Sequence, residues 1–216
     1  MLWFWSSSFA LNMLDEIIRG CNKEVAMAEI RRIETERLII ESTFVVDKSK
    51  ELMHAIHEAD EFEWYFGVEE TEQRLMEASI RRKWFYNIFD RERNFVGYLG
   101  FHRDGDDYEI EIYIIKEFRQ RGYARESLKA MMREAFAGNV MDTSKEDITR
   151  IVSSVRKENM PSRALMESCG FEPNKDVADF CILFQVSLDD DQLGEPIFLA
   201  HYCITRERFQ QTEESI

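Results

Sequence analysis

One segment constrains the fold more than any other part of the chain: a strand pattern that runs through a short basic loop directly into an amphipathic helix. Residues 108–114 alternate polar and apolar side chains with the two-residue period of a β-strand. From Gly122 onward, apolar residues recur on one helical face. The backbone N–H groups of the loop and the positive end of the helix dipole then point at one spot. This geometry suits a diphosphate, although an ordinary strand-to-helix turn with solvated arginines gives the same pattern.

The charge of the chain is unevenly distributed around this loop. The 216 residues carry 42 acidic and 28 basic side chains, a formal charge of -14. Residues 116–133 nevertheless hold six bases and two acids, whereas residues 51–80 hold nine acids and one base. A basic island in an acidic protein indicates a place for an anionic ligand, and the overall acidity disfavours a nucleic-acid-binding protein. Gly122 lets the backbone approach such a ligand closely, and Ala124 keeps the first helical turn narrow.

The other element patterns alternate between strands and helices around a hairpin-rich centre. The sequence Asp104-Gly105-Asp106 is a strong hairpin turn between two of the strands. Strands are expected at residues 37–40, 84–89, 95–101, 108–114, 148–155, 178–188 and 197–205. Helices are expected at residues 9–28, around 52–59, at 69–79, from 122 to 135 and at 161–168. This order predicts a mixed α/β protein rather than a doubly wound repeat.

The chain is predicted to be one domain, residues 31–210, with an N-terminal helical extension at 1–30 and an acidic tail at 211–216. Three interpretations of the extension stay open. It packs on the domain, it joins a homodimer, or it results from a translation start assigned too far upstream. No apolar run reaches the ~18–20 residues of a membrane span, and the first ten residues lack the basic start of a secretory signal. The four cysteines are dispersed and the histidines do not cluster, which favours a reducing cytoplasm and disfavours a structural metal site.

A second informative pattern begins at Asn159 and reads N-x-x-S-x-x-L-x-x-x-x-G-F. Asn159 can cap the helix that follows, and Ser162 can bond to the backbone in its first turn. Together with the loop, this pattern resembles the GNAT N-acetyltransferase superfamily, and most of all its Rim-type (RimJ/RimL-like) branch. The pyrophosphate loop of that family has Gln or Arg, then Gly three residues later and a small residue after two more. Arg119, Gly122 and Ala124 match these three positions.

Two strand segments extend the resemblance over residues 33–205. Residues 33–39 look like the T-E-R-L first strand of the Rim-type branch, and residues 95–101 look like its third strand. The resemblance implies a mostly antiparallel central sheet with flanking helices, acetyl-CoA as donor, an amine as acceptor and no metal. It implies acetyl-CoA binding by Ile114, Arg119, Gln120, Arg121, Gly122, Tyr123, Ala124, Arg125, Asn159 and Ser162. Gln120 stands where many relatives have an additional glycine.

The resemblance also gives a possible role to two carboxylates on the strand before the loop. Glu109 and Glu111 share one face of that strand and the isoleucines share the other, so the glutamates face away from the core. Such a pair is commonly a solvated face, but in this family the strand borders the acceptor. Glu109 matches the acidic residue of the Rim-type branch and is therefore ranked ahead of Glu111 as the base. Met166 stands where many relatives carry a tyrosine acid, which leaves Ser162 or water to protonate the thiolate.

These observations predict a cytoplasmic, acetyl-CoA-dependent N-acetyltransferase in which a primary amine attacks the thioester directly. The amine is either a small cationic amine or a protein N-terminus, and neither nucleic acid nor a membrane is an expected partner. Two other functions stay open: a non-catalytic acyl-CoA-binding or partner-binding module on the same fold, and a toxin-like transferase acting on charged tRNA. The resemblance implies that residues 51–80 border the acceptor, and their nine acids are then expected to attract cations.

Overall fold

The computed structural model describes residues 32–42, 84–140, 147–177, 181–182, 185–187, 190–193 and 197–214. The chain divides into two compact units, Met1–Ile30 and Arg31–Ile216, and all of the described residues belong to the second. The helices expected within residues 9–28 and 52–79 lie outside the described residues, and so does the acidic segment 51–80.

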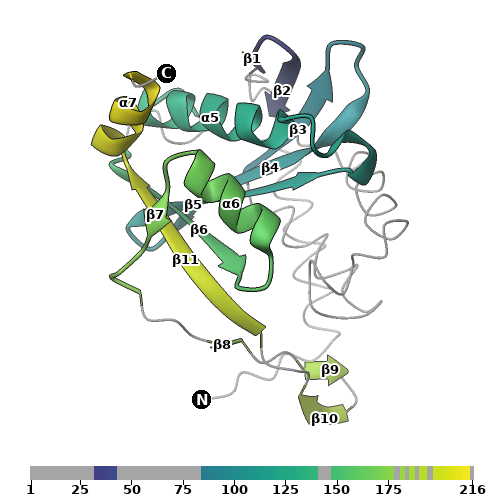
Figure 1. The fold of residues 1–216 in the computed structure, drawn as a ribbon, viewed down its shortest axis with the longest axis vertical. Helices are drawn as coiled ribbons and strands as arrows, with labels where there is room; N and C mark the ends of the chain where they lie inside the picture. The colour runs from purple at the N-terminus through teal and green to yellow at the C-terminus, as the bar shows by residue number, and fades with distance from the viewer. Residues whose placement is uncertain are drawn as a thin grey trace, which may run out of the picture. The chain divides into compact units, whose positions relative to one another are not determined.

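A nine-stranded sheet forms the centre of the described unit (Figure 1). Its strands are β1 (Arg32–Glu34), β2 (Leu38–Ser42), β3 (Trp84–Asp90), β4 (Phe95–Asp104), β5 (Asp107–Ile114), β6 (Arg150–Arg156), β7 (Glu172–Pro173), β8 (Cys181–Ile182) and β11 (Ile197–Thr205). They lie in the order β1-β2-β3-β4-β5-β6-β11-β7, and β8 also pairs with β11. Neighbouring strands are antiparallel except β5 and β6, which run parallel. The expected mixed, mostly antiparallel sheet is confirmed.

The hairpin between β4 and β5 forms where the sequence predicts it. Asp104 pairs with Asp107, so the turn consists of the two residues between them. Gly105, the first of these two residues, has a φ of 61°, the left-handed conformation that the favoured two-residue hairpin turns require. The turn fixes the register of the two central strands and therefore the face on which each side chain of β5 lies.

The two faces of β5 are occupied as the alternating pattern predicts. Ile110 and Ile114 are buried in the hydrophobic core, and Glu109 and Glu111 lie on the opposite face at intermediate exposure. Tyr113 shares the glutamate face and is buried, with its ring stacked on a tyrosine of β4 at a centroid distance of 6.2 Å. The glutamate face is therefore partly covered and is not simply a solvated surface.

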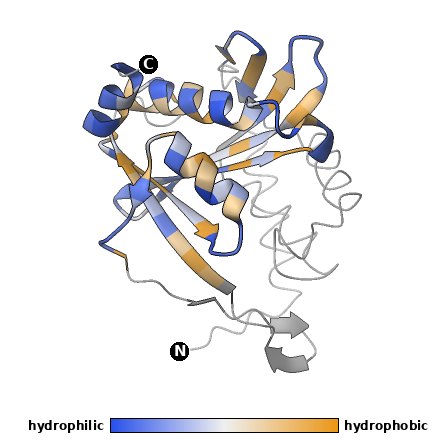
Figure 2. Ribbon diagram, viewed as in Figure 1, coloured by the Kyte–Doolittle hydropathy of each residue, from blue (hydrophilic) through white to orange (hydrophobic). Residues whose placement is uncertain are grey.

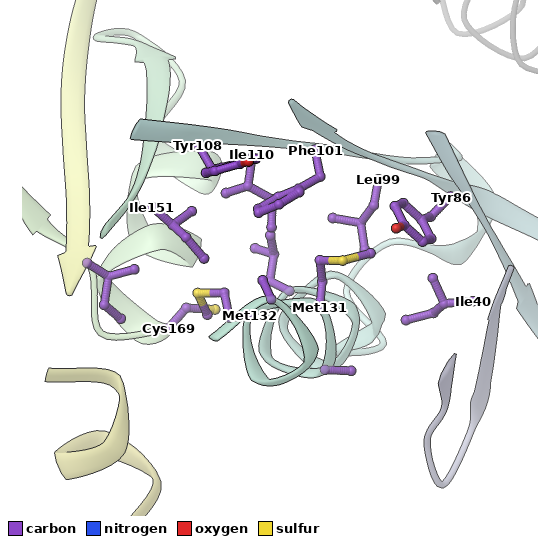
Figure 3. Close-up of a cluster of buried hydrophobic side chains, with 14 of the residues drawn as sticks. Ile40, Tyr86, Leu99, Phe101, Tyr108, Ile110, Met131, Met132, Ile151 and Cys169 are labelled. Atoms are coloured by element: carbon purple, nitrogen blue, oxygen red, sulfur yellow. The ribbon is translucent and has the colours of Figure 1, made fainter. Parts of the chain in front are cut away.

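Two helices cover the isoleucine face of the sheet. Helix α5 (Tyr123–Phe136) follows a short 3-10 turn, η2 (Lys116–Phe118), and helix α6 (Met160–Ser168) follows β6. Figure 2 shows apolar and polar stretches alternating along α5, as expected of a helix with one buried side. Met131 and Met132 of α5 are fully buried and lie beneath the sheet in Figure 3. Each such side chain contributes about 1.5–3 kcal/mol by burial, which anchors α5 and fixes the position of its first turn.

The prediction of one continuous strand near the C-terminus is wrong. Residues 178–188 were expected to form one strand, but the structure has two short strands there, β8 and β9 (Gln185–Ser187). Strand β8 pairs with β11, whereas β9 pairs with β10 (Asp190–Leu193) in a separate two-stranded sheet. The described parts of residues 178–188 therefore belong to two strands with different pairing partners.

The structure describes residues 211–214 of the expected acidic tail, residues 211–216. Residues 211–214 are the last part of helix α7 (Arg206–Glu214), which the sequence analysis does not predict. Thr205 Oγ1 accepts a hydrogen bond from the backbone N of Arg208 (3.3 Å), and Phe209 is buried. Glu213 accepts from Lys129 Nζ of α5 (2.9 Å). A capping threonine, one buried aromatic side chain and an ion pair thus hold these residues as a helix.

Candidate functional site

The loop between β5 and α5 turns through two left-handed residues. Ile115 N donates to Val96 O (2.9 Å), which fixes the end of β5 against β4. After η2, Gln120 has a φ of 60° and Gly122 has a φ of 80°. Gly122 is the N-cap of α5, whose first helical residue is Tyr123. The left-handed region is strained for a residue with a Cβ atom but open to glycine, which explains why a glycine stands at position 122.

Gln120 adopts the left-handed conformation without being glycine, which gives a test of the loop geometry. Gln120→Gly relieves strain of about 1 kcal/mol and is expected to preserve or raise the melting temperature. Gln120→Val, with a β-branched side chain, is expected to lower stability by about 1–2 kcal/mol. Thermal unfolding of the two variants checks this, because the exposed side chain makes other packing changes small. Equal stability of the two variants would show that position 120 is not left-handed.

The backbone N–H groups of this loop are open to a ligand. Within the described chain, no acceptor receives a hydrogen bond from the amides of residues 120–125. The first amides of a helix have no intrahelical acceptor, and no side chain caps α5. Residues 120–122 are exposed, whereas Tyr123 and Ala124 pack partly against the core. These amides, at the start of a 14-residue helix, are groups of the kind that bind anions at helix ends.

The arginines of the loop serve different purposes. Arg119 Nε donates to Ile114 O (2.8 Å), so Arg119 braces the end of β5. The guanidinium of Arg121 lies 5.3 Å from the ring centre of Phe118, and Arg125 is exposed on the first turn of α5. Of these three predicted cations, Arg121 and Arg125 are thus better placed than Arg119 to supply charge to an anion.

Asn159 and Ser162 lie together at the start of α6. Asn159 Oδ1 accepts a hydrogen bond from Ser162 N (3.1 Å), so Asn159 caps the helix. Both side chains are half-buried. Met166, one turn further along α6, is buried in the hydrophobic core, so position 166 faces the core. The capping role of Asn159 is confirmed, and contact of Asn159 or Ser162 with a ligand stays a prediction.

Strands β5 and β6 run side by side only briefly. Tyr108 pairs with Ile151 and Glu109 pairs with Val152, and the parallel pairing ends there. Strand β5 continues to pair with β4 through its last residue, and β6 continues to pair with β11 through its last residue. Each strand thus follows its outer neighbour, and the two central strands part after Glu109.

The predicted carboxylates lie where these strands part. Glu109 occupies the last paired position, and Glu111 lies beyond it on the same face of β5. The Glu111 side chain extends over Gly100 of β4: a Cβ atom there would come within 2.6 Å of Glu111 Cγ and Oε1. On the same face, Ser154 Oγ and His201 Nδ1 are 3.1 Å apart, because directly paired residues share a face. The sequence analysis does not select Ser154 or His201, which lie 47 residues apart.

Two cysteines of the described residues have little nucleophilic character. Cys169 is fully buried and Cys203 is partly buried. Burial raises the pKa of the Cys169 thiol and also the pKa of the Cys203 thiol. Thiols of raised pKa hold little thiolate at neutral pH, which argues against a covalent intermediate on either residue.

Neither a metal centre nor a membrane segment emerges from the described part of the chain. In the described ranges, no three or more His, Cys, Asp or Glu side chains group in a way that could hold a metal ion. Of the helices that the structure describes, none combines the length and the apolar character needed to span a membrane.

The fold matches several solved acetyltransferase structures. An acetyltransferase of the GNAT family from Bacillus anthracis aligns with a TM-score of 0.59 at 20% identity, over 82% of this chain and 99% of that chain. A putative ribosomal-protein-serine acetyltransferase from Vibrio cholerae aligns with a TM-score of 0.59 at 19% identity, over 83% and 99%. Spermidine N-acetyltransferase from Vibrio cholerae, in complex with CoA and spermine, gives 0.59 at 15% identity, over 82% and 99%. At these identities the likeness concerns the fold.

The sequence itself gives a family match. No curated protein sequence matches the chain significantly. The family model of the acetyltransferase (GNAT) domain, however, matches residues 30–172, which is more than half of the chain. The matched range contains the loop before α5, both carboxylates of β5 and the pattern that begins at Asn159. The chain therefore belongs to the GNAT acetyltransferase family.

Proposed function

We propose that this GNAT-family protein is an acetyl-CoA-dependent N-acetyltransferase of the Rim type that acts on a primary amine. The observation that carries the proposal is the row of amides at residues 120–125, for which the described chain provides no acceptor. These amides lie at the start of α5, directly after the central strand β5. The GNAT family uses acetyl-CoA. The diphosphate of acetyl-CoA is an anion of the kind that the N-terminus of a helix binds.

The exposure and the charge of the residues around these amides support the binding of a CoA diphosphate. Gly122 has no side chain to obstruct a ligand, and residues 120–122 are exposed. The basic excess of residues 116–133 adds a favourable potential to the dipole of α5. At the neighbouring helix, Asn159 and Ser162 are proposed to contact the arm of CoA. Bound acetyl-CoA supplies an activated acetyl group, and the residues of the chain hold and orient it.

The transfer is proposed to be a direct attack on the thioester. The nitrogen of a neutral amine forms a bond to the acetyl carbon, and the carbon–sulfur bond breaks. Glu109 takes the proton of the amine, directly or through one water, and the CoA thiolate takes a proton from Ser162 or from water. The position of Glu109 at the last pair between β5 and β6 supports this role. Backbone N–H groups of β5 beyond Glu109 are proposed to polarise the thioester carbonyl.

The acceptor is proposed to be a cationic amine. Among the structures similar to this chain, one is a spermidine N-acetyltransferase and another is a putative ribosomal-protein-serine acetyltransferase. In this chain the acidic residues 51–80, with nine acids and one base, favour an acceptor of positive charge. Both a polyamine and a basic protein N-terminus meet this requirement.

The enzyme is expected to use cationic acceptors less efficiently as salt is added. Salt screens the attraction between the acidic segment and a cationic amine, over about 8–10 Å at 0.1–0.15 M ionic strength. kcat/KM for spermidine should fall with rising sodium chloride, while kcat/KM for a neutral amine of similar size should change little. The KM for acetyl-CoA is measured at each salt concentration, because diphosphate binding also depends on salt. A preference for neutral or acidic acceptors, with no effect of salt, would make the acidic segment a solvated surface.

A panel of acceptors distinguishes the proposed enzyme from its alternatives. The full-length chain is incubated with acetyl-CoA and polyamines, aminoglycosides, peptides with basic N-termini or aminoacyl-tRNA, and release of free CoA thiol is measured. Thiol release that depends on a small amine or a peptide supports the proposal. Binding of CoA without turnover for any acceptor would favour the non-catalytic module, and turnover only with aminoacyl-tRNA would favour the toxin-like transferase.

A further inference from the structure

Helix α5 is joined to the turn between β1 and β2 through Glu126, in the first turn of the helix. Glu126 Oε1 accepts hydrogen bonds from Thr35 Oγ1 (2.5 Å) and from the backbone N of Arg37 (3.0 Å). Glu126 Oε2 accepts from Arg37 Nε (2.7 Å) and lies 2.5 Å from Arg37 Nη2. Both carboxylate oxygens are thus held by a turn that precedes Glu126 by 89 residues or more in the sequence.

The same guanidinium group also contacts the loop itself. Arg37 Nη1 donates to the backbone carbonyl of Arg121 (2.7 Å). Arg37 Nη2 lies 3.2 Å from the point where a Cβ atom on Gly122 would be. The guanidinium carbon lies 5.0 Å from the ring centre of Tyr123. One side chain therefore contacts Arg121 and Tyr123, the residues on either side of the left-handed Gly122 at the start of α5.

The charge of Glu126 makes this arrangement relevant to an anionic ligand. Burial would raise the pKa of Glu126, but hydrogen bonds from Thr35 and Arg37 outweigh burial and lower the pKa below its ordinary value. The carboxylate is consequently charged at neutral pH, close to amides that are proposed to hold a diphosphate. Arg37 neutralises that charge. A simple interaction between an acidic residue and the helix dipole would explain Glu126, but not the contacts of Arg37 with residues 121–123.

We propose that Arg37 is a positioning residue for CoA: it holds residues 121–123 in their anion-binding conformation and cancels the charge of Glu126 beside them. The inference rests on the proposed function, since it names CoA as the ligand. Arg37 acts through the loop and not on the reacting atoms, so it should affect the ground state and the transition state equally. Its loss is then expected to change KM and not kcat.

The first test is Arg37→Ala in the full-length chain. The Kd for CoA, measured by calorimetry, and the KM for acetyl-CoA are both expected to rise about ten-fold, the effect of losing one charge-assisted contact. kcat is expected to stay within about two-fold of the wild-type value. Arg37→Lys keeps the charge but loses the bidentate geometry, and an intermediate Kd is expected. Arg37→Lys also carries the test if circular dichroism shows Arg37→Ala to be unfolded.

A matched control and a double variant separate positioning from general stability. Arg208→Ala removes an ion pair of α7 with Glu172, outside the basic segment 116–133, and it is expected to leave the Kd for CoA unchanged. The double variant Arg37→Ala with Glu126→Gln is expected to bind CoA more tightly than Arg37→Ala alone, because the uncompensated carboxylate is gone. A purely structural role of Arg37 predicts no such recovery.

The outcomes distinguish this inference from the function on which it rests. An unchanged Kd for CoA in folded Arg37→Ala would overturn the positioning role and leave the proposed function standing. A lower kcat with unchanged KM would also overturn it, because Arg37 would then act on the chemical step. A wild-type chain that binds no CoA would overturn the proposed function and the positioning role together.

Discussion

Replacing Gly122 with aspartate is expected to abolish CoA binding while leaving the fold intact. Gly122 has a φ of 80°, a conformation that aspartate adopts more readily than most residues, so the backbone turn can persist. A Cβ atom there would lie 3.2 Å from Arg37 Nη2, so the added side chain also crowds the guanidinium group that contacts the loop. Like charges brought together cost several kcal/mol, so the Kd for CoA should rise by about 10²-fold or more. Calorimetry with CoA measures the effect.

Gly138→Asp is the matched control for this substitution. Gly138 has a φ of 72°, and a Cβ atom there would meet nothing within 4 Å. It follows the C-terminal end of α5, at the opposite end of the helix from the loop. The same change of residue in the same backbone region should therefore leave the Kd for CoA unaltered. If Gly122→Asp also binds CoA with unaltered affinity, the loop before α5 is not the diphosphate site.

Glu109→Gln is expected to lower kcat by about 10²–10⁴-fold, the usual contribution of general acid–base catalysis. The substitution keeps the shape of the side chain and removes its basicity. An amine acceptor is almost fully protonated at neutral pH, so loss of the proton acceptor leaves little reactive amine. The Kd for acetyl-CoA should hardly change. The fall in rate at low pH, which reports protonation of the base, should disappear from the pH profile of the variant.

Glu111→Gln provides the comparison, because Glu111 lies on the same face of β5 and its side chain extends over Gly100. We expect a smaller loss of kcat in Glu111→Gln than in Glu109→Gln. If Glu111→Gln is impaired and Glu109→Gln is active, Glu111 is the base, and the mechanism of direct attack on the thioester is unchanged. Full activity of both variants would assign proton removal to another group or to bulk water.

The parts of the site that could be predicted from sequence are those in which the pattern is local. The alternation of residues 108–114 predicts which face of β5 carries Glu109 and Glu111, and the burial of Ile110 agrees with it. The loop, the start of α5 near Gly122 and the cap at Asn159 are also contained within a few neighbouring residues. Local periodicity and capping chemistry suffice for such features.

The features that were missed depend on contacts between distant segments. Arg37 and Glu126 are 89 residues apart, and nothing in the T-E-R-L pattern alone indicates that its arginine contacts the loop before α5. Ser154 and His201 meet because β6 and β11 are neighbours in the sheet, an adjacency that strand patterns do not specify. The left-handed conformation of Gln120 could not be predicted for a different reason. Glutamine has no preference for left-handed backbone conformations, so the residue type gives no signal.

The most direct measurement of the proposed activity counts both products of one reaction. The full-length chain is incubated with acetyl-CoA and spermidine, free CoA thiol is quantified, and the acetylated amine is quantified by mass spectrometry in the same samples. The proposal predicts one thiol released for each acetyl group found on the amine, at a rate that depends on both substrates and is lost in Gly122→Asp. Thiol release that is independent of every amine tested, or CoA binding with no acetylated product, would contradict an N-acetyltransferase.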